Sequence, residues 1–150
     1  MRVRFALNGS PVEVEAGAGD NLLTVLRRDL GVLSVRETCG IGVCGACTAL
    51  VDGEPISTCL LLAPLAEGAA VTTAEGLADD HPVKRAFVEA HAFQCGFCTP
   101  GMVVTAAALL EESPSPTDEE IRLALAANLC RCGCYVKILE AVRRAAAWRS

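Results

Sequence analysis

Four cysteines in the first half of this 150-residue sequence have the spacing of iron–sulfur ligands. Cys39, Cys44 and Cys47 read C-x4-C-x2-C, and Cys59 follows after eleven further residues. Four thiolates with this spacing hold a plant-type [2Fe–2S] cluster. Three glycines inside the loop permit backbone conformations that a Cβ atom disfavours, and they let N–H groups approach the sulfurs. The motif predicts one-electron redox chemistry, with an ordinary cysteine loop or a zinc knuckle as the alternatives.

A second set of cysteines lies in the other half of the chain. Cys95 and Cys98 form a C-x2-C pair, and Cys130 and Cys132 form a C-x-C pair 31 residues later. Residues two apart do not share a helix face, so we expect the C-x-C pair on a turn. Four thiolates alone suit zinc as well as iron. Together with the first motif, they predict a second [2Fe–2S] cluster.

The two motifs together resemble those of a known family. The stretches QCGFCTPG (94–101) and NLCRC (128–132), combined with the first motif, resemble the iron–sulfur subunits of the xanthine dehydrogenase and carbon-monoxide dehydrogenase family of molybdenum hydroxylases. The resemblance covers nearly the whole chain. It implies an α+β protein with an N-terminal β-grasp, plant-type ferredoxin-like domain (residues 1–75) and a C-terminal four-helix [2Fe–2S] domain (residues 76–150).

The resemblance also implies a function that depends on partner subunits. A large subunit would hold molybdenum–pterin and hydroxylate the substrate, and a medium subunit would hold FAD, in a heterotrimer or a dimer of heterotrimers. This chain would relay electrons from the molybdenum–pterin centre through its two clusters to FAD or another acceptor. It would carry no catalytic residue of its own. Gln94 and Cys132 are expected to contact the edge of the pterin.

One position departs from the family pattern. Family members usually carry Thr-Gly between the C-x-C pair and the following tyrosine, whereas this chain has Gly133 and Cys134 before Tyr135. A free cysteine commonly packs as a small hydrophobic side chain. Alternatively, Cys134 competes as a ligand or protects the site against oxidation.

Hydrophobic periodicity indicates which elements position the cysteines. Residues 3–14 alternate around Asn8-Gly9, which predicts a β-hairpin. Asp20 is the expected N-cap of a helix ending near Leu30. Strands are expected over residues 48–51, 56–62 (with Cys59 on this strand) and 70–73. The second half predicts four helices, over residues 81–93, 99–112, 118–129 and 135–148, with a capping box at Thr117.

Composition limits the classes of partner and the cellular compartments that we expect for this protein. The net charge is −5 and no Lys/Arg run occurs, which argues against a nucleic-acid partner. No apolar run approaches the roughly 20 residues of a membrane span, and no secretory leader precedes the first strand. Clustered cysteines without a leader predict a cytoplasmic protein whose thiols stay reduced. A mean hydropathy of +0.40 reflects either a simple excess of alanine or apolar surface that partner subunits cover, and we favour the second explanation.

Two other classes of function remain open from the residues alone. One is a free-standing, two-cluster carrier that resembles a ferredoxin and needs no partner for its stability. The other is a zinc-binding structural module, which would be colourless. Iron and acid-labile sulfide would exclude the zinc module, and copurification with flavin and molybdenum chains would exclude the free-standing carrier.

Overall fold

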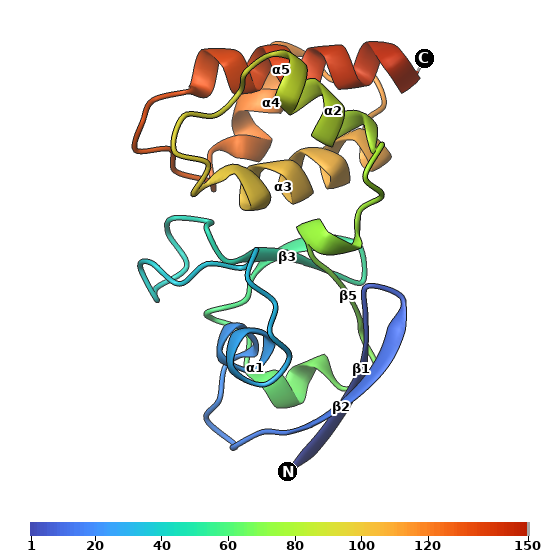
Figure 1. Ribbon diagram of the computed structural model, residues 1–150, viewed down its shortest axis with the longest axis vertical. Helices are drawn as coiled ribbons and strands as arrows, with labels where there is room; N and C mark the ends of the chain where they lie inside the picture. Colours follow the sequence, from blue (N-terminus) through green and yellow to red (C-terminus); the bar gives the residue numbers. More distant parts are fainter. Residues whose placement is uncertain (150) are drawn as a thin grey trace.

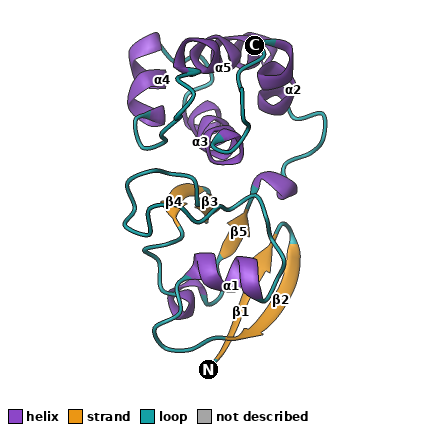
Figure 2. Ribbon diagram, turned by 60° about the vertical axis from the view of Figure 1, so that its left-hand side comes forward, coloured by secondary structure: helices purple, strands orange, loops and turns teal. Residues whose placement is uncertain are grey.

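The chain forms a sheet-containing lower part and a helical upper part in the computed structural model, which describes residues 1–149 (Figures 1 and 2). The lower part contains β1 (Arg2–Leu7), β2 (Ser10–Glu15), α1 (Leu22–Arg28), β3 (Thr48–Val51), β4 (Glu54–Ser57) and β5 (Ala70–Thr72). The upper part contains α2 (Pro82–Glu89), α3 (Thr99–Glu112), α4 (Asp118–Leu125) and α5 (Tyr135–Arg149). Short 3-10 turns cover Ala63–Ala66 and Ala74–Gly76. The α+β class is confirmed.

The five strands form one mixed sheet in the order β2-β1-β5-β3-β4. β1 and β5 are parallel, and the other neighbours are antiparallel. The expected hairpin is confirmed, because Arg2 pairs with Glu15 and Leu7 with Ser10 across the Asn8-Gly9 turn. The alternate residues Val3 and Phe5 are buried against α1 in one hydrophobic cluster. This β-grasp arrangement leaves the long segment between α1 and β3 free to form the cysteine loop.

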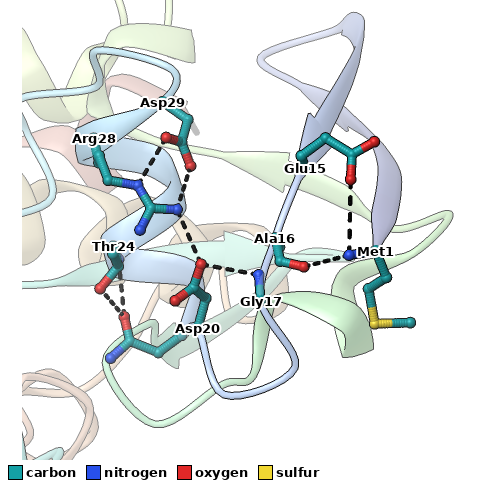
Figure 3. Close-up of polar contacts among 9 residues, drawn as sticks. Met1, Glu15, Ala16, Gly17, Asp20, Thr24, Arg28 and Asp29 are labelled. Atoms are coloured by element: carbon teal, nitrogen blue, oxygen red, sulfur yellow. Dashed lines mark hydrogen bonds and ion pairs between the residues drawn. The ribbon is translucent and has the colours of Figure 1, made fainter.

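The N-terminus of α1 differs from the prediction. Asn21, not Asp20, is the N-cap, and its side-chain oxygen accepts the N–H of Thr24 at 2.8 Å. Asp20 instead accepts the N–H of Gly17 at 3.1 Å and pairs with Arg28 at 2.9 Å (Figure 3). Both residue types cap helices well, so the tertiary ion pair with Arg28 decides which of the two does so here. The helix also ends earlier than expected, at Arg28.

The sequence predicted that Cys59 lies on a strand, and this prediction is wrong. β4 is an edge strand that ends at Ser57, and the chain then turns, with the N–H of Leu60 donating to the carbonyl of Ser57 at 3.0 Å. Within this turn the hydroxyl of buried Thr58 donates to the carbonyl of Cys47 at 2.7 Å. The turn therefore brings the fourth cysteine back to the loop that carries the other three.

The helical part has the four predicted helices among the residues described, but two of them are shorter. α2 ends at Glu89 because His91 adopts a left-handed conformation (φ 49°). α4 ends at Leu125, and the residues after it leave the helix to contact the lower part. The capping box between Thr117 and Glu120 is confirmed. The four helices surround a core of their own, which is separate from the core under the sheet.

The connection between the two parts is held against the lower part. The N–H of Thr73 donates to the side-chain oxygen of Asn8 at 2.9 Å. The carboxylate of Glu75 accepts the backbone N–H of Ser34 at 2.9 Å and the hydroxyl of Thr73 at 2.6 Å, and it also contacts the hydroxyl of Ser34. The connection is thus tied both to the first hairpin and to the segment that leads into the cysteine loop.

Replacing Glu75 with glutamine is expected to lower the free energy of unfolding by about 1 kcal/mol. Burial tends to raise the pKa of Glu75, but hydrogen bonds from Ser34 and Thr73 outweigh it and lower the pKa below the ordinary value. A lowered pKa contributes stability that is complete above the unfolded-state value, near pH 4.5, and is lost only at lower pH.

Denaturant unfolding of wild type and Glu75→Gln at pH 6 and pH 8 tests this expectation. The difference between the two proteins should be the same at both pH values, because the carboxylate is fully ionised throughout that range. A difference that grows from pH 8 to pH 6 contradicts the assigned direction of the pKa shift, because a raised pKa would add stability as the pH falls.

Candidate iron–sulfur centres

The first cysteine quartet is built around the loop between α1 and β3. The sulfur of Cys39 accepts the backbone N–H groups of Ile41 and Cys44, each at 3.5 Å. These N–H groups, together with the thiol of Cys44, lower the pKa of Cys39 to about 6. The glycine-rich loop thus points backbone donors at an anionic sulfur, which is what iron ligation by a thiolate needs.

Cys47 and Cys59 form the buried side of this quartet. Burial first, and then the hydrogen bond of its thiol to Cys47, raise the pKa of Cys59 to about 11. Cys39 also acts on Cys59 through its charge. The structure therefore brings together all four residues that the first motif predicts, in two pairs: Cys39 with Cys44, and Cys47 with Cys59.

The second quartet lies at one end of the helical part. Cys95 and Cys98 lie directly before α3, and Cys130 and Cys132 lie on the turn between α4 and α5, as predicted. The N–H of Phe97 donates to the sulfur of Cys95 at 3.5 Å and lowers the pKa of Cys95, with a further contribution from the thiol of Cys132. This end of the bundle thus gathers four sulfurs from two loops.

The inner pair of the second quartet is Cys98 with Cys130. Burial raises the pKa of Cys98 to about 12, and the hydrogen bond of its thiol to Cys130 acts in the same direction. For Cys130, burial tends to raise the pKa, but the N–H of Cys134 and the thiol of Cys98 outweigh it and lower the pKa. Each quartet therefore has a more exposed pair and a more buried pair.

The paired arrangement fits a two-iron cluster. All nine cysteines are free thiols. The thiol neighbours are arranged two by two, and a [2Fe–2S] cluster divides its four thiolates between two irons. Backbone N–H groups already directed at Cys39 and Cys95 complete the fit, since such hydrogen bonds tune the reduction potential.

The loops that carry the two quartets contact each other directly. The N–H of Leu129 donates to the carbonyl of Cys44 at 2.9 Å, and the side-chain amide of Asn128 donates to the carbonyl of Gly45 at 3.0 Å. Asn128 is almost completely buried there. A Cβ atom on Gly101, in the first turn of α3, would lie 2.4 Å from the carbonyl oxygen of Gly45. We call the contact of Gly45 with Gly101 and Asn128 the seam.

Arg36 makes a second link between the two loops. Its guanidinium donates to the carbonyls of Gly96 and Phe97, both at 2.8 Å, and lies 5.0 Å from the centre of the Phe97 ring. The sequence predicts no role for Arg36 or for Asn128, which is part of the NLCRC stretch, and it does not predict the seam. The only available signal was the position of Arg36 and Asn128 beside the two cysteine motifs, and spacing alone does not show that the motifs face each other.

Each quartet also has an exposed side. Gln94, Cys95 and Cys132 are exposed together at the end of the helical part. The exposed large apolar residues close in sequence to this quartet are Phe93, Phe97, Leu129, Tyr135 and Val136. Those close in sequence to the first quartet are Ile41, Val43, Leu60 and Leu62. Apolar surface beside each quartet is consistent with partners that cover it.

The fold and the two quartets define a two-cluster iron–sulfur protein of the electron-transfer class. Comparison with family models agrees: a "2Fe-2S iron-sulfur cluster binding domain" matches residues 5–78, and a "[2Fe-2S] binding domain" matches residues 73–143. The family models thus show two [2Fe–2S] clusters, one in each half of the chain.

Relatives and solved structures then identify the family. The chain is 49% identical to a nicotinate dehydrogenase subunit from Pseudomonas putida, over 98% of this chain and 96% of the relative. It is 47% identical to the nicotinate dehydrogenase small FeS subunit of Eubacterium barkeri, over 97% and 94%. The crystal structure of quinoline 2-oxidoreductase from Pseudomonas putida 86 matches with a TM-score of 0.94 and 39% identity, over 99% of this chain and 94% of that one.

The chain belongs to the iron–sulfur small subunits of the molybdenum hydroxylase family. It is an electron-transfer subunit of an oxidoreductase whose substrate chemistry takes place on other, larger subunits. Within residues 1–149, no helix is both long enough and apolar enough to cross a membrane.

Proposed function

We propose that the eight paired cysteines are the cluster ligands. Cys39, Cys44, Cys47 and Cys59 would hold one [2Fe–2S] cluster, and Cys95, Cys98, Cys130 and Cys132 would hold the other. The observation that carries this assignment is the gathering of each set of four sulfurs into two neighbouring pairs. When bound, such clusters accept and release single electrons. The two separate hydrophobic cores support a division into two domains near residue 75.

The finer composition of the complex is also a proposal. A large subunit would hold molybdenum–pterin, and a medium subunit would hold FAD, in a heterotrimer or a dimer of heterotrimers. The two exposed apolar areas, one beside each quartet, support two different neighbours for this chain. The seam places the loops of the two quartets in contact, which supports passage of electrons from one cluster to the other.

Gln94 and Cys132 are the proposed contacts to the pterin. Both are exposed beside Cys95, so a partner can reach them without a change in this chain. The amide of Gln94 can donate and accept hydrogen bonds, as an edge rich in ring nitrogens and carbonyls requires.

The substrate would bind to the large subunit of the complex. Nicotinate is the first substrate to test, because this chain is similar to subunits of nicotinate dehydrogenases. Nine free thiols support a reducing, cytoplasmic location.

Isolation of the native complex tests the proposed function. We expect about four irons and four acid-labile sulfides per copy of this chain, and two distinguishable EPR signals in the reduced protein. Flavin and molybdenum–pterin should copurify on larger chains. A monomeric, iron-loaded chain that never copurifies with them would instead be a free-standing carrier. A colourless protein that binds zinc would refute the cluster assignment.

A further inference from the structure

A cavity with two arginines lies where the loops of the two quartets meet. Its volume is about 450 Å³, and its lining consists of Arg27, Leu33, Arg36, Glu37 and Phe97. Arg27 is in the last turn of α1, whereas Arg36 and Glu37 lie in the segment that leads into the first cysteine loop. Phe97 lies in the loop of the second quartet. We call this cavity the arginine pocket, and it borders both loops.

The two arginines of the pocket carry charges that no carboxylate neutralises within residues 1–149. Every other arginine except Arg131 pairs there with an Asp or Glu carboxylate. The carboxylate of Glu37 lines the pocket but forms no ion pair with Arg27 or Arg36. The lining therefore holds two positive charges and one negative charge, in a chain whose net charge is −5.

Both guanidinium groups are fixed through a single nitrogen. Nη1 of Arg27 donates to the carbonyl of Val35 at 2.7 Å. Nη1 of Arg36 donates to the carbonyls of Gly96 and Phe97, both at 2.8 Å. In the described part of the chain, Nε and Nη2 of both arginines have no acceptor. These two nitrogens form the edge of a guanidinium that binds a carboxylate through two parallel hydrogen bonds.

Apolar side chains flank these free edges. Leu33 is 66% exposed and Phe97 is 45% exposed, and the Phe97 ring lies 5.0 Å from the guanidinium carbon of Arg36. Arginine and aromatic side chains are enriched among the residues that dominate binding at protein interfaces. A small inorganic anion would leave Leu33 and Phe97 exposed, whereas a protein loop with a carboxylate would cover them and neutralise the charge.

We propose that the arginine pocket is a docking site for an Asp or Glu side chain on a larger subunit of the complex. This inference rests on the proposed assembly of this chain with larger subunits. The partner's carboxylate would accept N–H groups from Nε and Nη2 of the arginines. Because the surface of this chain is otherwise acidic, the pocket selects where a negatively charged partner segment can bind, and it orients both quartets relative to that partner.

The test measures how tightly the isolated complex holds this chain, by dilution and mass photometry at about 50 mM and about 500 mM salt. Replacing Arg27 with glutamine removes one charge and one free edge. We expect the Kd between this chain and the larger subunits to rise about tenfold to a hundredfold at the lower salt concentration. The Kd of Arg27→Gln should also depend less on salt than that of wild type, because a screened ion pair is missing.

Glu37→Gln is the matched variant with the opposite expectation. It removes a negative charge from the same pocket, so an incoming carboxylate is repelled less, and the Kd should fall about twofold to fivefold. Iron content and EPR accompany both variants, because Arg27 also holds the segment at Val35. If Arg27→Gln does not load its clusters, the change of Kd in Glu37→Gln decides the inference, since the Glu37 carboxylate makes no contact within residues 1–149.

Three results would overturn the inference. The first is an unchanged Kd in Arg27→Gln with both clusters present. The second is a Kd that is unchanged or higher in Glu37→Gln. The third is calorimetric binding of inorganic phosphate to the intact wild-type complex that Arg27→Gln abolishes, because the pocket would then be open to small anions rather than filled by a partner.

The proposed function and this inference fail in different samples. If the wild-type chain never copurifies with larger subunits, the proposed complex fails and the docking site fails with it. If the wild-type complex forms and the two variants hold their partners as wild type does, only the role of the arginine pocket fails.

Discussion

Replacing Gly45 with alanine is expected to separate the two domains and to cost about 4 kcal/mol of stability. An added Cβ atom would lie 2.2 Å from the carbonyl oxygen of Ala127 and 2.9 Å from the Cα atom of Asn128. Both of these atoms belong to the backbone, so they cannot move aside by rotation of a side chain. The backbone of Gly45 is also left-handed (φ 68°), which costs an L-residue roughly 1–2 kcal/mol.

Gly40→Ala is the matched control, because it lies in the same loop with nearly the same backbone angle. Gly40 has φ 66°, and a Cβ atom there would meet nothing within 4 Å. Gly40→Ala should therefore lose only the stability that a left-handed backbone costs an L-residue, about 1–2 kcal/mol. Thermal unfolding and limited proteolysis between residues 76 and 81 measure the two effects. Equal losses in the two variants would show that the seam does not hold the domains together.

Serine in place of one ligand from each quartet is expected to remove one cluster and leave the other. Cys47→Ser should abolish the EPR signal of the ferredoxin domain and halve the iron content, because a serine hydroxyl is a poor replacement for a thiolate toward iron. Cys98→Ser should do the same to the helical domain. Both cysteines belong to the more buried pair of their quartet.

Iron analysis, visible absorption and EPR of the reduced variants measure this outcome. Cys134→Ser is the control, since it makes the same chemical change beside a quartet without removing a proposed ligand. Each variant should also unfold at a lower temperature than wild type, because metal binding contributes to the stability of small domains. Loss of both signals from either single substitution would contradict two independent quartets.

The cysteine motifs could be predicted because their chemistry demands fixed residue types at fixed spacing. The hairpin and the capping box at Thr117 were predicted for a similar reason, since Asn8-Gly9 and the Thr117–Glu120 pair specify their structures locally. Element ends were less predictable. Asn21 replaced Asp20 as the cap of α1 because Asp20 pairs with Arg28, and a contact eight residues away is not part of the local pattern.

The placement of Cys59 shows the same limit. Apolar residues continue past Ser57 and suggested a longer strand, whereas the chain turns so that Thr58 can donate to the carbonyl of Cys47. The contacts of Asn128 and Arg36 join segments 83 and 60 residues apart, respectively. Hydrophobic periodicity in the sequence does not predict contacts between such distant residues. Only the structure shows how the two motifs face each other.

The seam has a consequence for protein engineering. Gly45 belongs to one half of the chain, while Gly101 and Asn128 belong to the other, and the three fit together without room for a side chain on either glycine. Chimeras that graft the first half of one homologue onto the second half of another should assemble only when these three positions are transferred as a set. Exchange of either half alone between enzymes would otherwise disturb the spacing across which electrons must tunnel.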